Sequence, residues 1–165
     1  MKKLILFGLT CIASCALAYL QPTKGDKTTD VHAYVSTHSE FPKNGLQEFT
    51  CSNCRALNNA VFVAPISTCG TGSCDYMLFE RKGQEAKYIT TISIAAGAFE
   101  FLKSSHNGYP DIKIYQHLSA DEGMISTLQF DGNEYKTTGK QKKIASNKLQ
   151  TELQPEKVTA KSINP

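Results

Sequence analysis

The chain has 165 residues, of which 41% are hydrophobic and 20% charged, and it contains six cysteines and no tryptophan. This composition excludes a disordered polymer, which lacks enough apolar residues to form a core, and it excludes a helical membrane bundle, which would be far more apolar. The length predicts a single domain.

The start of the chain resembles a secretory signal. Two lysines at positions 2 and 3 precede an apolar run over residues 4–15, which is too short to cross a bilayer core that needs about 20 residues. The Ala16-Leu17-Ala18 sequence favours cleavage after residue 18. The alternative is a bacterial lipobox ending at Cys15, which would make the protein a lipoprotein anchored through that residue. We therefore expect a periplasmic or secreted protein.

The charge changes sign along the chain. Residues 19–138 carry ten Lys and Arg against thirteen Asp and Glu, whereas residues 139–165 carry six Lys against two Glu. The last segment has no aromatic residue and no sustained apolar period, so it offers little burial to offset the entropy of ordering. The sequence thus predicts a signal peptide (1–18), one β domain (19–138) and a Lys-rich, mobile C-terminal tail (139–165).

Between signal and tail, short runs rich in β-branched and aromatic residues alternate with Gly, Pro, Asn and Asp, which is typical of strands and turns. A strand is expected at 31–35, and a loop or short helix at 45–57. Further strands are expected at residues 60–64, 76–81, 87–94, 112–118, 124–130 and 134–138. Such spacing predicts an all-β fold: a small antiparallel sandwich, barrel or propeller-like sheet.

The alternation within two of these strands predicts which side chains face the core. Ile112 and Ile114 are expected to face inward, with Lys113 and Tyr115 outward. In the next strand Met124, Leu128 and Phe130 are expected to share one face, and the Asp131-Gly132 pair that follows predicts a hairpin turn.

Four cysteines follow the signal, in the pattern C-x2-C-x14-C-x4-C. In an oxidising compartment we expect two disulfides, Cys51 with Cys54 and Cys69 with Cys74, which would staple the β domain. Crossed pairings and a four-thiolate zinc ribbon remain as alternatives. A C-x-x-C pair also suggests thiol–disulfide exchange, but no strand that would lead into a helix precedes Cys51. We expect a structural staple and no bound metal or cofactor.

A series of turn-and-strand motifs begins at the second cysteine pair: C-G-T-G-x-C at 69–74, N-G-Y-P-D-I at 107–112 and F-D-G-x-x-Y at 130–135. In this order they resemble a loose group of small secreted bacterial proteins of unknown function, similar to diverged FG-GAP (integrin-type β-propeller) repeats. The resemblance covers residues 58–135. FG-GAP repeats bind calcium through D-x-N-x-D-G-x-x-D, of which residues 104–111 keep only Gly108 and Asp111, so the resemblance does not imply calcium binding here.

Known catalytic motifs are absent from the sequence, which lacks H-E-x-x-H and G-x-S-x-G, and the net acidic body excludes a phosphate-binding surface for nucleic acid. The four histidines are scattered, and Asp121-Glu122 lies in a Gly-containing turn. We therefore expect a binding protein that acts on a protein partner, such as an inhibitor of a wall-degrading enzyme or an immunity protein. The alternative is an extracytoplasmic hydrolase of envelope polymers.

The segments 104–111 and 120–123 each join two expected strands, and such loops carry recognition more often than strands do. They contain the expected contact residues, which combine a titratable ring, an amide, an aromatic ring and carboxylates: His106, Asn107, Tyr109, Asp111 and Asp121. The competing interpretation is that Asn107, Gly108 and Pro110 only form a turn.

Overall fold

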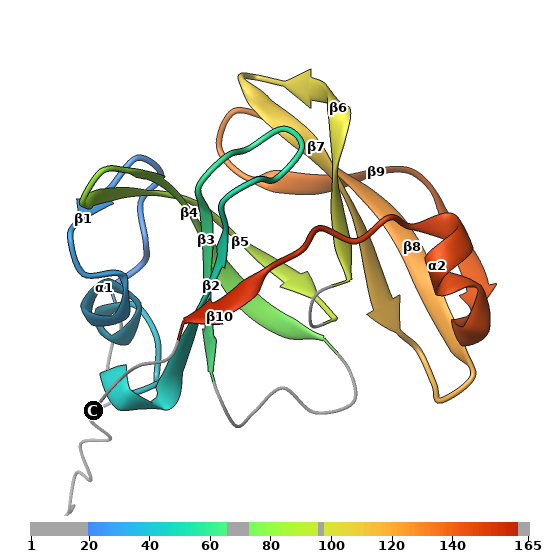
Figure 1. Ribbon diagram of the computed structural model, residues 1–165, viewed down its shortest axis with the longest axis horizontal. Helices are drawn as coiled ribbons and strands as arrows, with labels where there is room; N and C mark the ends of the chain where they lie inside the picture. Colours follow the sequence, from blue (N-terminus) through green and yellow to red (C-terminus); the bar gives the residue numbers. More distant parts are fainter. Residues whose placement is uncertain (1–19, 66–72, 96–97, 162–165) are drawn as a thin grey trace, which may run out of the picture.

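The computed structural model describes residues 20–65, 73–95 and 98–161. They form two antiparallel sheets, one of six strands in the order β1-β5-β4-β3-β2-β10 and one of four strands in the order β6-β7-β8-β9 (Figure 1). We call them sheet A and sheet B. The strands of sheet A are β1 (Lys27–Thr28), β2 (Leu46–Cys51), β3 (Ala60–Pro65), β4 (Cys74–Lys82), β5 (Glu85–Ile94) and β10 (Thr159–Lys161). The strands of sheet B are β6 (Phe99–His106), β7 (Tyr109–His117), β8 (Glu122–Phe130) and β9 (Tyr135–Ala145).

The prediction of a mostly-β fold with antiparallel sheets is confirmed. Both sheets are open, so the barrel alternative is wrong. Among the described residues there is also no ring of blades as in a propeller. Sheet B alone is a simple meander, in which each strand pairs with its neighbour in the sequence.

The two sheets share one apolar core. Alternate residues of β3, β4 and β5 face alternate residues of β6, β7 and β8, because side chains of a strand point to opposite faces in turn. Phe62 of sheet A and Phe99 of sheet B meet at a ring-centroid distance of 4.7 Å. Ile112, Ile114 and Phe130 lie in this core, as predicted from their alternation.

The outer face of each sheet is also partly covered. On sheet A, helix α1 (Val31–Thr37) packs Val31 and Val35 onto the strands. On sheet B, Tyr115 is fully buried with Leu153, which follows helix α2 (Leu149–Glu152). Tyr115 does lie on the face opposite Ile114, but the expectation that it points to solvent is wrong, because that face is also covered.

Three expectations for local structure need correction. The segment beginning at Val31 is a helix rather than a strand, because the Asp30 side chain accepts a hydrogen bond of 3.0 Å from Ala33 N and caps the first turn. Of the residues expected to form a loop or short helix (45–57), Leu46–Cys51 form strand β2 after the 3-10 turn η1 (Lys43–Gly45), and the remainder is loop. Strand β6 was not predicted, because its second half (Lys103 to His106) is polar and exposed.

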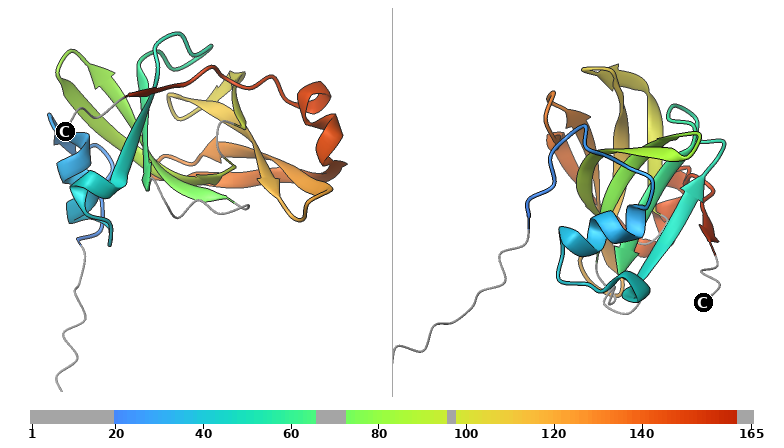
Figure 2. Two further views of the ribbon diagram at one scale, coloured as in Figure 1. Left: turned by 60° about the horizontal axis from the view of Figure 1, so that its bottom comes forward. Right: turned by 90° about the vertical axis from the view of Figure 1, so that its left-hand side faces the viewer.

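The C-terminal segment differs most from the expectation of a mobile tail. Strand β9 continues to Ala145, and the 3-10 turn η2 (Ser146–Lys148) and α2 follow it. Residues 153–161, which we call the C-terminal strap, then run from α2 across to sheet A, where β10 pairs with β2 (Figures 1 and 2). The β domain therefore extends at least to Lys161.

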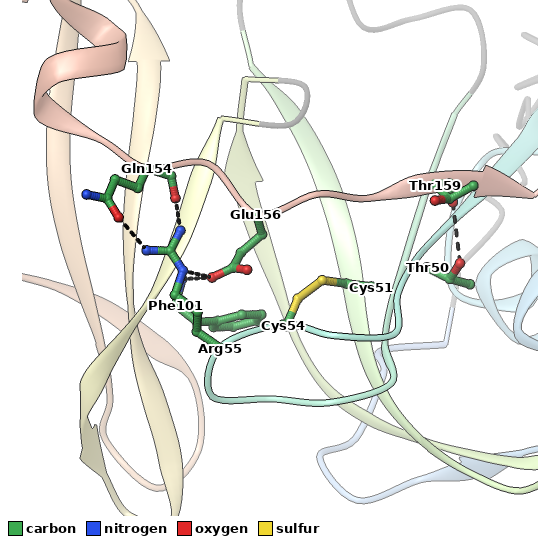
Figure 3. Close-up of a disulfide and its surroundings, with 8 residues drawn as sticks. All are labelled: Thr50, Cys51, Cys54, Arg55, Phe101, Gln154, Glu156 and Thr159. Carbon is green, nitrogen blue, oxygen red and sulfur yellow. Dashed lines mark hydrogen bonds and ion pairs between the residues drawn. A yellow bond between two sulfur atoms is a disulfide. The ribbon is translucent and has the colours of Figure 1, made fainter.

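An ion pair between the exposed Arg55 and the buried Glu156 holds the strap in place, next to a disulfide (Figure 3). Cys51 and Cys54 are bonded, with their Cα atoms 5.5 Å apart, as predicted. The next residue, Arg55, places Nε 3.0 Å from Oε1 of Glu156 in the strap. The same Glu156 oxygen accepts a hydrogen bond of 3.2 Å from Phe101 N of β6. The strap is thus tied both to sheet B and to the loop after β2.

Cys74 at the start of β4 is also disulfide-bonded. Its expected partner, Cys69, lies outside the described residues, as do Cys11, Cys15 and the predicted signal.

Candidate functional site

The β6–β7 hairpin carries four of the five predicted contact residues. Its turn consists of Asn107 (φ +50°) and Gly108 (φ +84°), both in the left-handed region. Two such residues in sequence form the turn that matches the twist of a two-stranded hairpin, and Asn and Gly adopt that conformation most readily. The sequence Asn-Gly therefore determines where β6 ends and where His106 is presented.

The buried Asp111 of β7 accepts hydrogen bonds from side chains of β6 and so holds the hairpin side chains in place. Its side chain is only 3% exposed, yet both carboxylate oxygens have donors. Oδ1 lies 2.6 Å from Nδ1 of His106, whereas Oδ2 accepts from Ser104 Oγ at 2.6 Å and from Gln129 Nε2 at 3.3 Å. Burial raises the pKa of Asp111, but these hydrogen bonds outweigh burial and hold the pKa below its usual value. The carboxylate is therefore ionised at neutral pH.

The negative charge of Asp111 determines which nitrogen of the neutral His106 ring carries the proton. An ionised carboxylate only accepts hydrogen bonds, so Nδ1 of His106 must be the donor. In the neutral ring the proton is then on Nδ1, and Nε2 is an acceptor. Because the His106 side chain is 46% exposed, this fixed ring is offered to solvent or to a partner.

Asn107 and Tyr109 attach the hairpin to the rest of the molecule. Asn107 Nδ2 donates to Phe130 O at 2.8 Å, and the Tyr109 ring packs edge-on against Phe130 at 4.8 Å between centroids. Lys87 Nζ donates to the Tyr109 hydroxyl at 3.2 Å. Asn107 thus has the structural role that the competing interpretation assigned to it, and the Tyr109 ring is half-buried. His106 is exposed beside them.

The structure does not bring Asp121 to this cluster. Asp121 lies in the turn after β7, whereas the hairpin tip lies before it, so the nine residues of β7 separate them by about 30 Å. The two loops expected to act together therefore lie at opposite ends of one strand. The expected strand at 112–118 already lies between the two segments, so their separation follows from the predicted elements.

Two further residues of the cluster had no predicted role. Ser104 lies within the expected contact segment, but Gln129 lies in β8, distant in sequence. Since β8 pairs with β7 through Leu128 and Ile112, Gln129 comes beside Asp111. Only the strand register shows this contact.

One group of potential metal ligands is found among the described residues: Cys51, Cys54 and Glu156, whose ligand atoms all lie within 4.8 Å of one another. Both sulfurs are in the disulfide, and Glu156 is paired with Arg55. In the oxidised protein neither cysteine is a thiolate, so this group has no free thiolate for a metal.

A catalytic relay is not formed at the hairpin either. In a serine hydrolase the imidazole lies between the hydroxyl and the carboxylate and accepts the hydroxyl proton. Here the carboxylate of Asp111 lies between Ser104 and His106, and the Ser104 proton is directed to Asp111. Ser104 is therefore not activated by His106.

Comparison of the chain with protein-family models, curated proteins and solved structures finds no match. Within residues 20–65, 73–95 and 98–161, no helix is long and apolar enough to cross a membrane.

Proposed function

We propose that this is an extracytoplasmic binding protein without catalytic activity, which recognises a protein partner with the tip of the β6–β7 hairpin. The observation that carries the proposal is the His106 ring, which is 46% exposed and yet held by a buried carboxylate at 2.6 Å. A side chain that is already fixed loses little conformational entropy when it binds, so more of its contact energy appears as affinity.

The local architecture supports the same role. The hairpin tip projects from sheet B (Figure 1), and Asn107 and Tyr109 brace it against Phe130. A braced, projecting hairpin is suited to entering a partner's cleft. Within the binding class, we propose an inhibitor of a wall-degrading enzyme or an immunity protein.

The compartment is part of the proposal. The Cys51–Cys54 disulfide supports a periplasmic or secreted location, because disulfides persist in oxidising compartments. The signal-like start, with either release after residue 18 or lipidation at Cys15, remains a prediction from the sequence.

The proposal includes two finer assignments of the fold, a sandwich and a similarity to FG-GAP repeats. The core shared by the two sheets supports the sandwich class. The four-stranded meander of sheet B is the arrangement of a propeller blade, which supports the proposed similarity to diverged FG-GAP repeats. The donors on both Asp111 oxygens argue against that residue as a calcium ligand.

One observation favours the alternative, a hydrolase of envelope polymers. An imidazole with Nδ1 on a carboxylate and Nε2 exposed has the geometry of a general base. If this alternative holds, purified protein would release soluble fragments from cell-wall material, and His106→Ala would abolish the release. The binding proposal expects no release by either protein.

Capture from the native envelope tests the binding proposal. Tagged wild-type protein, His106→Ala and His117→Ala are cross-linked in the envelope fraction and recovered. His117 is a matched control, because it is an exposed histidine at the other end of β7. We expect the same partner with wild type and His117→Ala and none with His106→Ala, while all three proteins remain folded at the temperature of capture. Equal recovery by all three proteins would disprove the role of the hairpin.

A further inference from the structure

A cavity of about 560 Å³ lies on the outer face of sheet A. Helix α1 covers one part of this face, and the cavity lies beside it, between the end of α1 and strands β3, β4 and β5. Its volume falls within the range of small-molecule sites. It shares no lining residue with the hairpin site.

The floor of the cavity is apolar. Val35 of α1, Val63 of β3 and Met77 of β4 line it and are each less than a tenth exposed. These side chains would be in contact with an apolar part of a ligand, which would lose its water contacts on entry.

The rim is polar, and the charged side chains on it are carboxylates, which only accept hydrogen bonds. Glu40 and Asp75 are both exposed, and neither forms an ion pair with another described residue. No Lys or Arg lines the cavity among the described residues. His38 adds a third acceptor: its Nδ1 lies 2.7 Å from Tyr34 O, which can only accept, so Nε2 is the acceptor of the neutral ring.

The His38 ring is also held in place. It stacks on Tyr34 with ring centroids 4.0 Å apart and planes inclined by 23°. The rim therefore combines two carboxylates, one oriented imidazole and the hydroxyl-bearing residues Thr91 and Ser93 of β5. Two carboxylates on a rim that no Lys or Arg lines among the described residues attract positive charge, and the acceptors require a hydrogen-bond donor.

We propose that this cavity binds a small organic cation, an amine that carries an apolar group. The ammonium lies at the rim, where it donates to Asp75 and Glu40, and the apolar group lies on Val63 and Met77. This inference is independent of the hairpin proposal, because the two sites lie on different sheets.

Amide NMR spectra recorded during titration with three probes of matched skeleton test this site. The probes are phenethylamine, phenethyl alcohol and phenylacetate. Phenethylamine is expected to shift the amide signals of residues 38–41, Asp75, Thr91 and Ser93, and to bind more tightly than the alcohol, while phenylacetate does not bind. No shift with phenethylamine would overturn the proposal, and so would equal affinity for amine and alcohol, which would indicate an uncharged site.

The rim carboxylates are then changed singly. Asp75→Asn and Glu40→Gln should each weaken phenethylamine binding about fivefold or more, because each removes one charge near the ammonium. Asp121→Asn is the control, since it removes an exposed carboxylate that does not line the cavity. All three side chains are exposed, so the folded state is retained. An unchanged dissociation constant in both rim variants would contradict the proposed placement of the cation.

Discussion

At the residue scale, Gly123 of β8 shows how closely the covered face of sheet B is packed. A Cβ atom at Gly123 would lie 1.9 Å from the Tyr115 ring. Tyr115 is fully buried, and its hydroxyl lies 3.1 Å from Ser146 Oγ, so the ring cannot move aside. The absence of a side chain at Gly123 is therefore a condition for burying Tyr115.

We expect Gly123→Ala to lower the free energy of unfolding by about 2 kcal/mol or more, because overpacking of a filled core costs about 1–3 kcal/mol. Urea denaturation measures the change. Gly45→Ala is the control, since its Cβ would lie 3.4 Å from Pro42, an ordinary contact. If both variants unfold at the wild-type urea concentration, the placement of Tyr115 is wrong.

Asp111 makes stability depend on pH in a defined direction. Its folded-state pKa is lowered from the usual 3.8, so its contribution is fully present above that pH and is lost as the pH falls through the lower folded value. We expect Asp111→Asn to be less stable than wild type by about 1–3 kcal/mol at neutral pH. The difference in stability between the variant and wild type should become smaller as the pH falls below 3.8, the usual pKa of Asp. Urea unfolding across that range checks it, and a constant difference would contradict the role of the charge.

At the scale of elements, α1 depends on its cap. Asp30 Oδ1 accepts from Ala33 N at 3.0 Å, and its other oxygen pairs with Lys43. Asp30→Ala should destabilise the protein by about 1 kcal/mol, whereas Asp30→Asn keeps the cap and should cost much less. Thermal unfolding of the two variants distinguishes the contribution of the capping hydrogen bond from that of the ion pair with Lys43. Equal losses would show that the Lys43 pair, and not the cap, stabilises the helix.

The C-terminal strap depends on Glu156. Replacing it with Ala leaves Phe101 N–H and Nε of Arg55 without this acceptor, which should cost about 1–3 kcal/mol. The other guanidinium nitrogens of Arg55 keep Glu100 and Gln154 as acceptors. Glu156→Gln keeps an acceptor oxygen and should cost less. Amide hydrogen exchange at residues 159–161 should accelerate most in the Ala variant. Unchanged exchange in that variant would mean that β10 holds the strap without Glu156.

At the scale of the whole molecule, the sequence was informative where a strand has its own apolar pattern. β3, β4, β5, β7 and β8 were predicted near their true bounds because their burial leaves alternating or continuous apolar runs. Residues 139–161 lack such runs, because they lie at edges and on outer faces, where only single residues such as Ile144, Leu153 and Glu156 are buried. Edge strands expose lysines, so this segment has the composition of a tail.

The candidate site was predictable only in part, for a related reason. The Asn-Gly turn determined where His106 would be presented, and turn chemistry is local. Two partners of Asp111, Ser104 and His106, lie in the same hairpin, but the third, Gln129, is brought beside it only by the β7–β8 register. Alternation along a strand predicts which face a residue occupies, but it does not predict the side chain beside it.

The central claim is that the His106 ring, fixed by Asp111, makes the main contact with a partner. Calorimetric titration of the captured partner into wild type, His106→Ala and His117→Ala tests this claim most directly. We predict that His106→Ala binds at least about tenfold more weakly, which is about 1.4 kcal/mol, while His117→Ala binds like wild type and all three proteins are folded at the temperature of the titration. Wild-type affinity in His106→Ala, or an equal loss in His117→Ala, would contradict the proposed site.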